Sequence, residues 1–185
     1  PTALTASTTH TDVLCNGDAT GDILLTVSGG TVGAGYTYQW NPNVSTTNSV
    51  SSLGAGTYNV TVVDANGCTL QQTAVVTEPP LLTVGALPLD ASCFGEATGQ
   101  IAATALGGTP NYTYTATLNN VDFVSSQNGQ FSSLIAGSYT VLVVDVNNCI
   151  ASTTTQITEP AALTANVATT DALCYNASNG QLDVL

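Results

Sequence analysis

Basic residues are absent from this sequence of 185 residues, which has no lysine or arginine but carries 12 aspartate and glutamate residues and one histidine. Phosphate backbones are held mainly by Lys and Arg side chains, and anionic membrane surfaces attract the same cations. With a formal net charge of −12, the chain would be repelled by both. The missing bases therefore argue against nucleic acids and anionic membranes as partners.

Long apolar runs and methionine are also absent. A helix that crosses a bilayer needs about 18 or more apolar residues in a row, and the sequence contains no such stretch. We therefore expect no direct insertion into a membrane. Because neither an initiating methionine nor a signal peptide is present, we expect a processed or interior segment whose targeting signal lies outside it.

Charged side chains make up only 6% of the residues, against about 25% in an ordinary soluble domain. Solubility must therefore come from Ser, Thr, Asn and Gln side chains. Together with abundant Gly and β-branched residues, this composition is typical of strands and turns, and it is poor in good helix formers. We expect an all-β chain without helices.

The sequence repeats itself once and then begins a third time. Each unit starts with a proline, followed 14 residues later by a cysteine that has an aspartate three residues before it. These sets are Pro1, Asp12 and Cys15; Pro79, Asp90 and Cys93; and Pro160, Asp171 and Cys174. Further matches are Gly-Gly-Thr at 29–31 and 107–109, a Cys-terminated segment at 53–68 and 134–149, and Thr-Glu-Pro at 77–79 and 158–160.

These matches predict one domain at 1–78, a second at 79–159 and the start of a truncated third at 160–185. A repeat that stops after one strand and the start of another cannot close a core. We therefore expect further chain, or another subunit, to complete the third repeat.

Apolar residues alternate with polar ones in short segments, which is the pattern of half-buried strands. Tyr58, Val60 and Val62 share one face, and Tyr139, Val141 and Val143 share the equivalent face in the second unit. About seven such strands per unit, separated by Gly, Asn and Pro turns, predict a β-sandwich. Asn66-Gly67 predicts a type I′ hairpin turn, with Asn147-Asn148 as a weaker equivalent.

Five cysteines in an all-β chain without bases indicate an oxidising compartment. Two sets of disulfides fit the repeats equally well. Bonds within units would be Cys15–Cys68 and Cys93–Cys149, with Cys174 pairing downstream; bonds across junctions would be Cys68–Cys93 and Cys149–Cys174, with Cys15 pairing upstream. Geometry favours the first set, because a last strand, a linker and a new strand would separate Cys68 from Cys93. A zinc site lacks support without Cys-x-x-Cys or clustered histidines.

The ordered set of motifs resembles the SprB-type repeat, which is akin to PKD and other Ig-like modules. The motifs are Cys-Asn-Gly-Asp-Ala-Thr-Gly-Asp-Ile from residue 15, Gly-Gly-Thr, Tyr-Thr-Tyr-Gln-Trp, Leu-x-Ala-Gly-Thr-Tyr-x-Val-x-Val-x-Asp-Ala-Asn-Gly-Cys and Thr-Glu-Pro. The second unit departs from them at Ala116, in place of tryptophan, and at Asn148, in place of glycine. This family occurs in tandem in large surface adhesins of Bacteroidota. The resemblance implies secretion, a cell-surface or filament setting and an adhesive or spacer role, with no ligand or functional residues.

No catalytic residues are expected. The one histidine, His10, has no histidine at the equivalent positions of the other units, and a nucleophile needs a base beside it. Calcium is the more serious cofactor hypothesis, with the recurring acids Asp12, Asp64, Asp90 and Asp145 as candidate ligands. The alternative is that Asp64 and Asp145 accept hydrogen bonds from backbone amides of their own turns, which we favour because calcium prefers six or more oxygens.

Sugars enter the sequence in two ways. Four asparagines stand in Asn-x-Ser/Thr glycosylation sequons, although chance alone would give nearly as many; they are Asn43, Asn59, Asn111 and Asn176. Five aromatic residues could form a sugar-binding platform, although their alternation on one strand face favours a core position; they are Tyr36, Tyr38, Trp40, Tyr112 and Tyr114.

The sequence thus predicts a non-enzymatic structural module of a secreted adhesin or extracellular filament. Its expected partners are neighbouring repeats or copies of itself. The two alternatives are a carbohydrate-binding module, which would bind surface glycans, and a spacer repeat made rigid by calcium.

Overall fold

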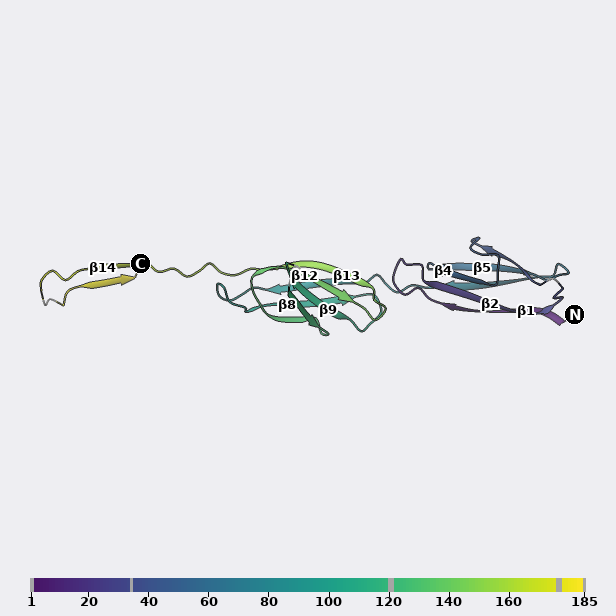
Figure 1. Ribbon diagram of the computed structural model, residues 1–185, viewed down its shortest axis with the longest axis horizontal. Helices are drawn as coiled ribbons and strands as arrows, with labels where there is room; N and C mark the ends of the chain where they lie inside the picture. Colours follow the sequence, from purple (N-terminus) through teal and green to yellow (C-terminus); the bar gives the residue numbers. More distant parts are fainter. Residues whose placement is uncertain (1, 34, 120–121, 176–177, 185) are drawn as a thin grey trace.

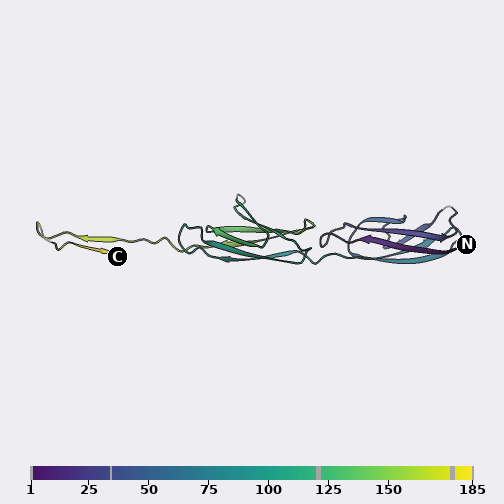
Figure 2. The same cartoon turned by 90° about the horizontal axis from the view of Figure 1, so that it is seen from below.

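The computed structural model describes residues 2–33, 35–119, 122–175 and 178–184. Within these ranges every helix or strand is a strand, so the all-β prediction is confirmed. The chain forms two β-sandwiches and a separate pair of strands, and both views show these three parts in a line (Figures 1 and 2). An extended segment joins the second sandwich to the pair of strands.

The first sandwich consists of two three-stranded antiparallel sheets. One sheet has the order β1-β2-β4, with β1 (Thr2–Thr11), β2 (Gly21–Gly30) and β4 (Ser49–Leu53). The other has the order β3-β5-β6, with β3 (Thr37–Asn41), β5 (Gly56–Val63) and β6 (Thr69–Val76). Ile23 and Leu25 from the first sheet and Val60 and Val62 from the second are fully buried between them.

The second sandwich repeats this arrangement with one more described strand. Its smaller sheet has the order β11-β8-β7, with β7 (Thr83–Leu89), β8 (Gly99–Leu106) and β11 (Gln130–Leu134). Its larger sheet has the order β10-β9-β12-β13, with β9 (Thr113–Leu118), β10 (Asp122–Ser126), β12 (Gly137–Val144) and β13 (Ile150–Ile157). Its buried cluster is separate from that of the first sandwich.

Strand alternation predicted the inner faces correctly. Tyr58, Val60 and Val62 are buried, as are Tyr139, Val141 and Val143. The hairpin between β5 and β6 also lies where Asn66-Gly67 predicted it, but its turn type differs. Gly67 has a φ of 83°, whereas Asn66 is not left-handed as a type I′ turn would require. The loop is longer than two residues, because Asp64 N–H donates to the carbonyl of Cys68 across it.

The third part of the chain is a two-stranded sheet of β14 (Val167–Thr170) and β15 (Gln181–Val184). Both strands are exposed along their whole length. Leu163 and Leu182 correspond to Leu82 and Ile101 of the second sandwich, where they are buried. The same pattern therefore stays exposed where the remaining strands of a sandwich are not packed against it.

Strand direction fixes what lies at each end of a sandwich. At one end, the Val13 N–H donates to the Thr77 carbonyl, so the ends of β1 and β6 lie together. At the other end, the Thr31 N–H donates to the Asp64 carboxylate, so the end of β2 lies beside the β5–β6 turn. The second sandwich has the same arrangement. We call the first the exit end and the second the entry end.

Candidate functional site at the junction of the sandwiches

A disulfide bond joins the two sandwiches where they meet. It links Cys15, in the loop that follows β1, to Cys149, in the turn between β12 and β13, with the two Cα atoms 5.6 Å apart. Cys15 therefore comes from the exit end of the first sandwich, and Cys149 from the entry end of the second. The Cys15 side chain packs against the core of the second sandwich.

This pairing corrects the predicted bonds Cys15–Cys68 and Cys93–Cys149, neither of which forms. Cys68 precedes β6, whose eight residues run to the exit end where Cys15 lies. Eight strand residues cover about 26 Å, whereas a disulfide needs Cα atoms within about 7 Å. The alternative bonds Cys68–Cys93 and Cys149–Cys174 do not form either, because Cys68, Cys93 and Cys174 are free and exposed.

The turn that carries Cys149 is held by a buried carboxylate. Asp145 accepts hydrogen bonds from the N–H groups of Thr109 at 2.8 Å, Asn147 at 2.9 Å and Cys149 at 2.9 Å. Gly108 has a φ of 61°, and a Cβ there would lie 2.8 Å from the Asp145 carboxylate. The Gly-Gly-Thr motif and the Asp-x-Asn-x-Cys motif thus form one unit, which we call the Asp145 turn (residues 145–149).

The first sandwich has the same unit at its own entry end, which we call the Asp64 turn (residues 64–68). Asp64 accepts hydrogen bonds from the N–H groups of Thr31 at 2.9 Å, Asn66 at 3.0 Å and Cys68 at 2.8 Å. These amides, that of Thr31 foremost, hold the pKa of the Asp64 carboxyl below its ordinary value. Cys68 therefore sits in the same kind of turn as Cys149, but without a partner.

The loop that carries Cys15 is fixed by the Thr-Glu-Pro motif. We call residues 12–20 the Cys15 loop. Asp12 accepts a hydrogen bond from the Thr77 N–H at 2.7 Å, which lowers the pKa of that carboxyl, and Glu78 accepts one from the Gly17 N–H at 2.7 Å. Asn16 donates to the Pro79 carbonyl at 3.0 Å. The acid and the linker that recur in every unit therefore shape the loop that presents the cysteine.

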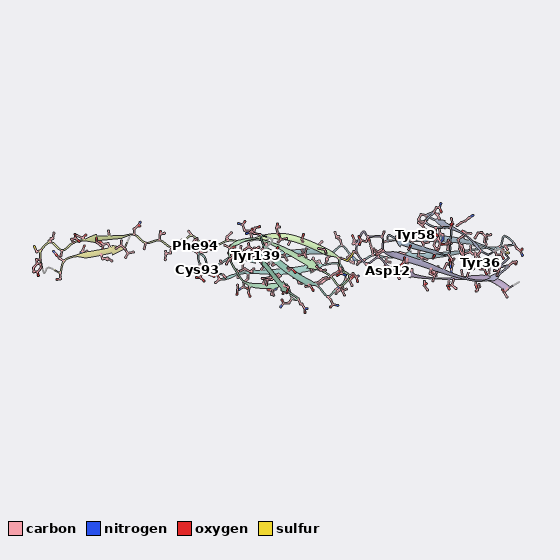
Figure 3. All side chains as sticks on the ribbon, in the orientation of Figure 1. Asp12, Tyr36, Tyr58, Cys93, Phe94 and Tyr139 are labelled. Carbon is pink, nitrogen blue, oxygen red and sulfur yellow. A yellow bond between two sulfur atoms is a disulfide. The ribbon has the colours of Figure 1, made fainter. Side chains whose placement is uncertain are left out.

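The second sandwich builds an equivalent loop at its exit end, around Cys93. Asp90 accepts a hydrogen bond from the Thr158 N–H at 2.8 Å, which lowers the pKa of its carboxyl. Glu159 accepts one from the Gly95 N–H at 2.7 Å. Figure 3 shows Asp12 at the junction end of the first sandwich, and Cys93 and Phe94 at the end of the second sandwich that faces away from it.

Polar contacts accompany the disulfide across the junction. The Asn147 side-chain amide donates to the Leu14 carbonyl at 3.2 Å and to Thr109 Oγ1 at 3.0 Å. Cys149 Sγ lies 3.4 Å from the same Leu14 carbonyl. Asn147 thus ties its own sandwich to the preceding one, a role that its position in a hairpin turn did not reveal.

The acids predicted as calcium ligands are used in another way. Asp12 and Asp64 lie at opposite ends of the sandwich, so the predicted pair does not form. Asp64 and Asp145 accept backbone amides of their own turns, which confirms the alternative interpretation. Among the described residues no three or more His, Cys, Asp or Glu side chains gather in a group that could hold a metal.

The other candidate residues are distributed as follows. His10 is exposed and lies 3.7 Å from Asp12. Trp40 and Tyr114 are buried, and Tyr36, Tyr38 and Tyr112 pack against the two cores, which confirms the core interpretation of these aromatic residues. Asn43, Asn59 and Asn111 are exposed, while Asn176 lies outside the described residues. Glycosylation of these asparagines stays a prediction.

Three solved structures give the range of structural likeness to this chain. They are the C-terminal 282-residue fragment of intimin in complex with the translocated intimin receptor (18% identity, 85% of this chain and 64% of that one, TM-score 0.42), the N-terminal four Ig domains of Dscam1 isoform 9.44 (12%, 86% and 47%, 0.39), and domains 4–9 of the surface layer protein SbsC (16%, 98% and 35%, 0.37). The chain thus spans less than two thirds of each.

Sequence comparison gives a narrower result. None of the curated proteins is significantly similar in sequence to this chain. In the described part of the chain, no helix has the length and apolar character needed to cross a membrane. The family model for the SprB repeat matches residues 7–45 and 89–122, one segment in each sandwich. The resemblance to the SprB repeat is therefore confirmed: the chain carries two copies of this repeat, folded as Ig-like β-sandwiches.

Proposed function

We propose that this chain is a non-enzymatic spacer segment of a secreted, cell-surface adhesin or extracellular filament. Its domains would be residues 1–78 and 79–159, with 160–185 as the beginning of a third. The observation that supports this proposal most is the junction, where a disulfide and side-chain hydrogen bonds hold one repeat in line with the next. Neighbouring repeats are then its principal partners.

The linker between the sandwiches leaves little freedom to bend. Only residues 77–82 separate β6 from β7, and Thr77, Glu78 and Pro79 are already bonded to the Cys15 loop. Two consecutive prolines, Pro79 and Pro80, further restrict the backbone. With the disulfide as a second covalent connection, rotation of one sandwich about the other should be small. Such a junction suits a spacer that holds a distant part of a protein away from a surface.

Small-angle X-ray scattering tests the proposal on the intact chain. The oxidised protein should scatter as an elongated particle with the two sandwiches in line. The Cys15→Ser variant should give a broader distribution of distances between the sandwiches, because only the linker and the hydrogen bonds remain. An oxidised chain whose sandwiches fold back against each other would contradict a spacer role.

The two alternatives receive less support from the contacts. A sugar platform needs exposed rings, and the five candidate aromatic residues pack against the cores. In the described residues the large exposed aromatic side chains are Phe94 and Tyr175, so glycan binding that is lost in a Phe94→Ala variant would favour the carbohydrate-binding alternative. A melting temperature that falls on addition of a chelator would favour a calcium-stabilised repeat.

Glycosylation would add polar surface to a chain with few charges. Asn43, Asn59 and Asn111 have exposed side chains, and Asn59 lies on the outer face of β5. Intact-mass measurement of the secreted protein tests this, with a discrete mass excess expected at each modified site. A mass equal to that of the bare chain would exclude glycans from this segment.

A further inference from the structure

Each sandwich has half of a junction at either end, and two of these halves are open. Cys93 stands in the second sandwich where Cys15 stands in the first, and it is exposed and unbonded. Cys68 stands in the first sandwich where Cys149 stands in the second, and it is also exposed and unbonded. The free cysteines of the two sandwiches are therefore the two whose counterparts form the junction disulfide.

The open half at Cys93 is hollow. Ser92, Cys93 and Phe94 line a cavity of about 430 Å³ together with residues 160–163 of the following linker. At the existing junction, the equivalent residues Cys15, Asn16, Leu81 and Leu82 face Asn148, Cys149 and Ile150 of the second sandwich. The surface beside Cys93 thus lacks the turn that covers its counterpart.

The open half at Cys68 is already shaped for bonding. The Asn66 side-chain amide donates to Thr31 Oγ1 at 2.9 Å, as that of Asn147 does to Thr109 Oγ1. In the second sandwich the same amide also reaches the Leu14 carbonyl of the preceding repeat. The Asp64 turn therefore presents an amide and a thiol in the arrangement that binds a Cys15 loop.

We propose that the hollow beside Cys93 is the docking site for the entry-end turn of the repeat that begins at residue 160, closed by a disulfide between Cys93 and the second cysteine of that repeat. By the same rule Cys68 bonds the first cysteine of a repeat that precedes it. The occupant is identified by residues 160–184, because β14 and β15 pair as β7 and β8 do at the start of the second sandwich. The inference concerns covalent linkage and does not depend on the proposed location or spacer role.

The bond requires an oxidant, which we take to be a disulfide of a small molecule or of a thiol–disulfide oxidoreductase. The Cys93 thiolate attacks one sulfur of that disulfide and releases a thiol. The incoming cysteine thiolate then attacks the mixed disulfide, forms the bond between repeats and releases the second thiol. Two protein thiols are oxidised, and one oxidant disulfide is reduced to two thiols.

Duplication of a repeat tests the proposal with natural junction sequences. A second copy of residues 79–159 is inserted after residue 159 of the full chain, so that a complete sandwich follows the first Cys93. Non-reducing peptide mapping should find this Cys93 bonded to the inserted counterpart of Cys149. The bond Cys15–Cys149, mapped in the same digest, is the internal control, and labelling of this Cys93 by iodoacetamide should fall from complete in the original chain to undetectable.

The outcomes separate cleanly. Protection of the inserted β12–β13 hairpin from hydrogen exchange establishes that the new sandwich has folded. If this insertion does not fold, the same mapping is done on the original chain extended after Leu185 by residues 105–159, which completes the third repeat. In a folded protein of either kind, a Cys93 that stays reactive, or that pairs with Cys68 of a second molecule, would overturn the proposal. The spacer proposal would survive this result, because the junction at Cys15 would remain.

Discussion

Where the first sandwich buries Trp40, the second sandwich has Ala116. Trp40 is buried among the core residues of the first sandwich, and its indole N–H donates to the Thr47 carbonyl at 2.8 Å. In the second sandwich a cavity of about 250 Å³ opens beside Ala116, lined also by Leu118, Val124, Leu134 and Tyr139 among others. The second sandwich also pairs an additional strand, β10, with β9. The two cores are thus filled differently.

The ends of the two sandwiches, in contrast, are nearly identical. The Asp64 and Asp145 turns use the same three amide donors, and both exit loops use the same acids. A core tolerates exchange of side chains so long as it stays apolar and reasonably filled. An end that must fit the next repeat has no such latitude, because donor, acceptor and sulfur positions are all fixed by the neighbour.

Exchanging the core residues should produce the largest effects. Trp40→Ala removes a buried aromatic side chain and should destabilise the first sandwich by about 3–5 kcal/mol. Ala116→Trp should fill the cavity of the second sandwich and leave its stability unchanged or raised. Hydrogen exchange of β5 and β12 measures the two sandwiches separately. Loss of protection in β12 after Trp40→Ala would show that the cores are coupled and would break the comparison.

Removing the carboxylate of a turn should act on the ends. Asp145→Ala leaves three N–H groups without an acceptor, at about 1–3 kcal/mol for each that stays buried, so the β12–β13 hairpin should lose protection from exchange. The Asp64→Ala variant should loosen the β5–β6 hairpin in the same way. The first variant should also slow reoxidation of Cys15 with Cys149 after reduction. An unchanged reoxidation rate would mean that the Asp145 turn does not prepare the cysteine.

Acid should weaken both sandwiches through the carboxylates that accept amides. The folded-state pKa values of Asp12, Asp64 and Asp90 lie below their ordinary values. Their contribution to stability is therefore complete above about pH 4 and is lost as the pH falls through the folded-state values. Neutralising 12 acids also removes charge repulsion, which acts in the opposite direction.

The Asp64→Asn variant isolates this contribution in the first sandwich. The single tryptophan, Trp40, reports on that sandwich alone, so urea unfolding followed by its fluorescence gives the pH dependence directly. The wild-type midpoint should fall more steeply below pH 4 than that of the variant. Parallel acid limbs for the two proteins would contradict a stabilising role for the Asp64 carboxylate.

The smallest effect is expected where Asn148 replaces the turn glycine. Asn148 has a φ of 66°, in a region that asparagine enters more easily than most residues but less easily than glycine. Asn148→Gly should therefore stabilise the Asp145 turn by less than about 1 kcal/mol, and Gly67→Asn should weaken the Asp64 turn by a similar amount. Denaturant midpoints of the two variants check this, and shifts of equal sign would contradict it.

Much of the fold followed from local patterns, but the pairing of the cysteines did not. Alternation identified Val60 and Val62 as core, and the recurrence of Asp64 before a turn indicated its amide contacts. The disulfide depends instead on how many times the chain reverses direction between two cysteines. Five described strands, β8 to β12, separate Cys93 from Cys149. Because each strand reverses the chain, an odd number places these cysteines at opposite ends.

That count was available from the sequence, since about seven strands per unit imply five between the two cysteines. What the sequence did not contain was the position of the next repeat. The Leu14 carbonyl and the Asn147 amide become partners only because one sandwich follows the other in line. Local propensity describes the interior of a repeat, whereas its surface contacts depend on the neighbour.

The bond between residues 15 and 149 also determines how the chain carries mechanical load. Tension applied at the two termini would pass along β1, cross the sulfur atoms and leave along β13, without entering the residues between the cysteines. The bond closes a loop with a sequence separation of 134, which would add about 450 Å of length if it were free to extend. Pulling can therefore denature neither core by drawing this loop out, and the chain would stay short under a force that lengthens other tandem sandwiches.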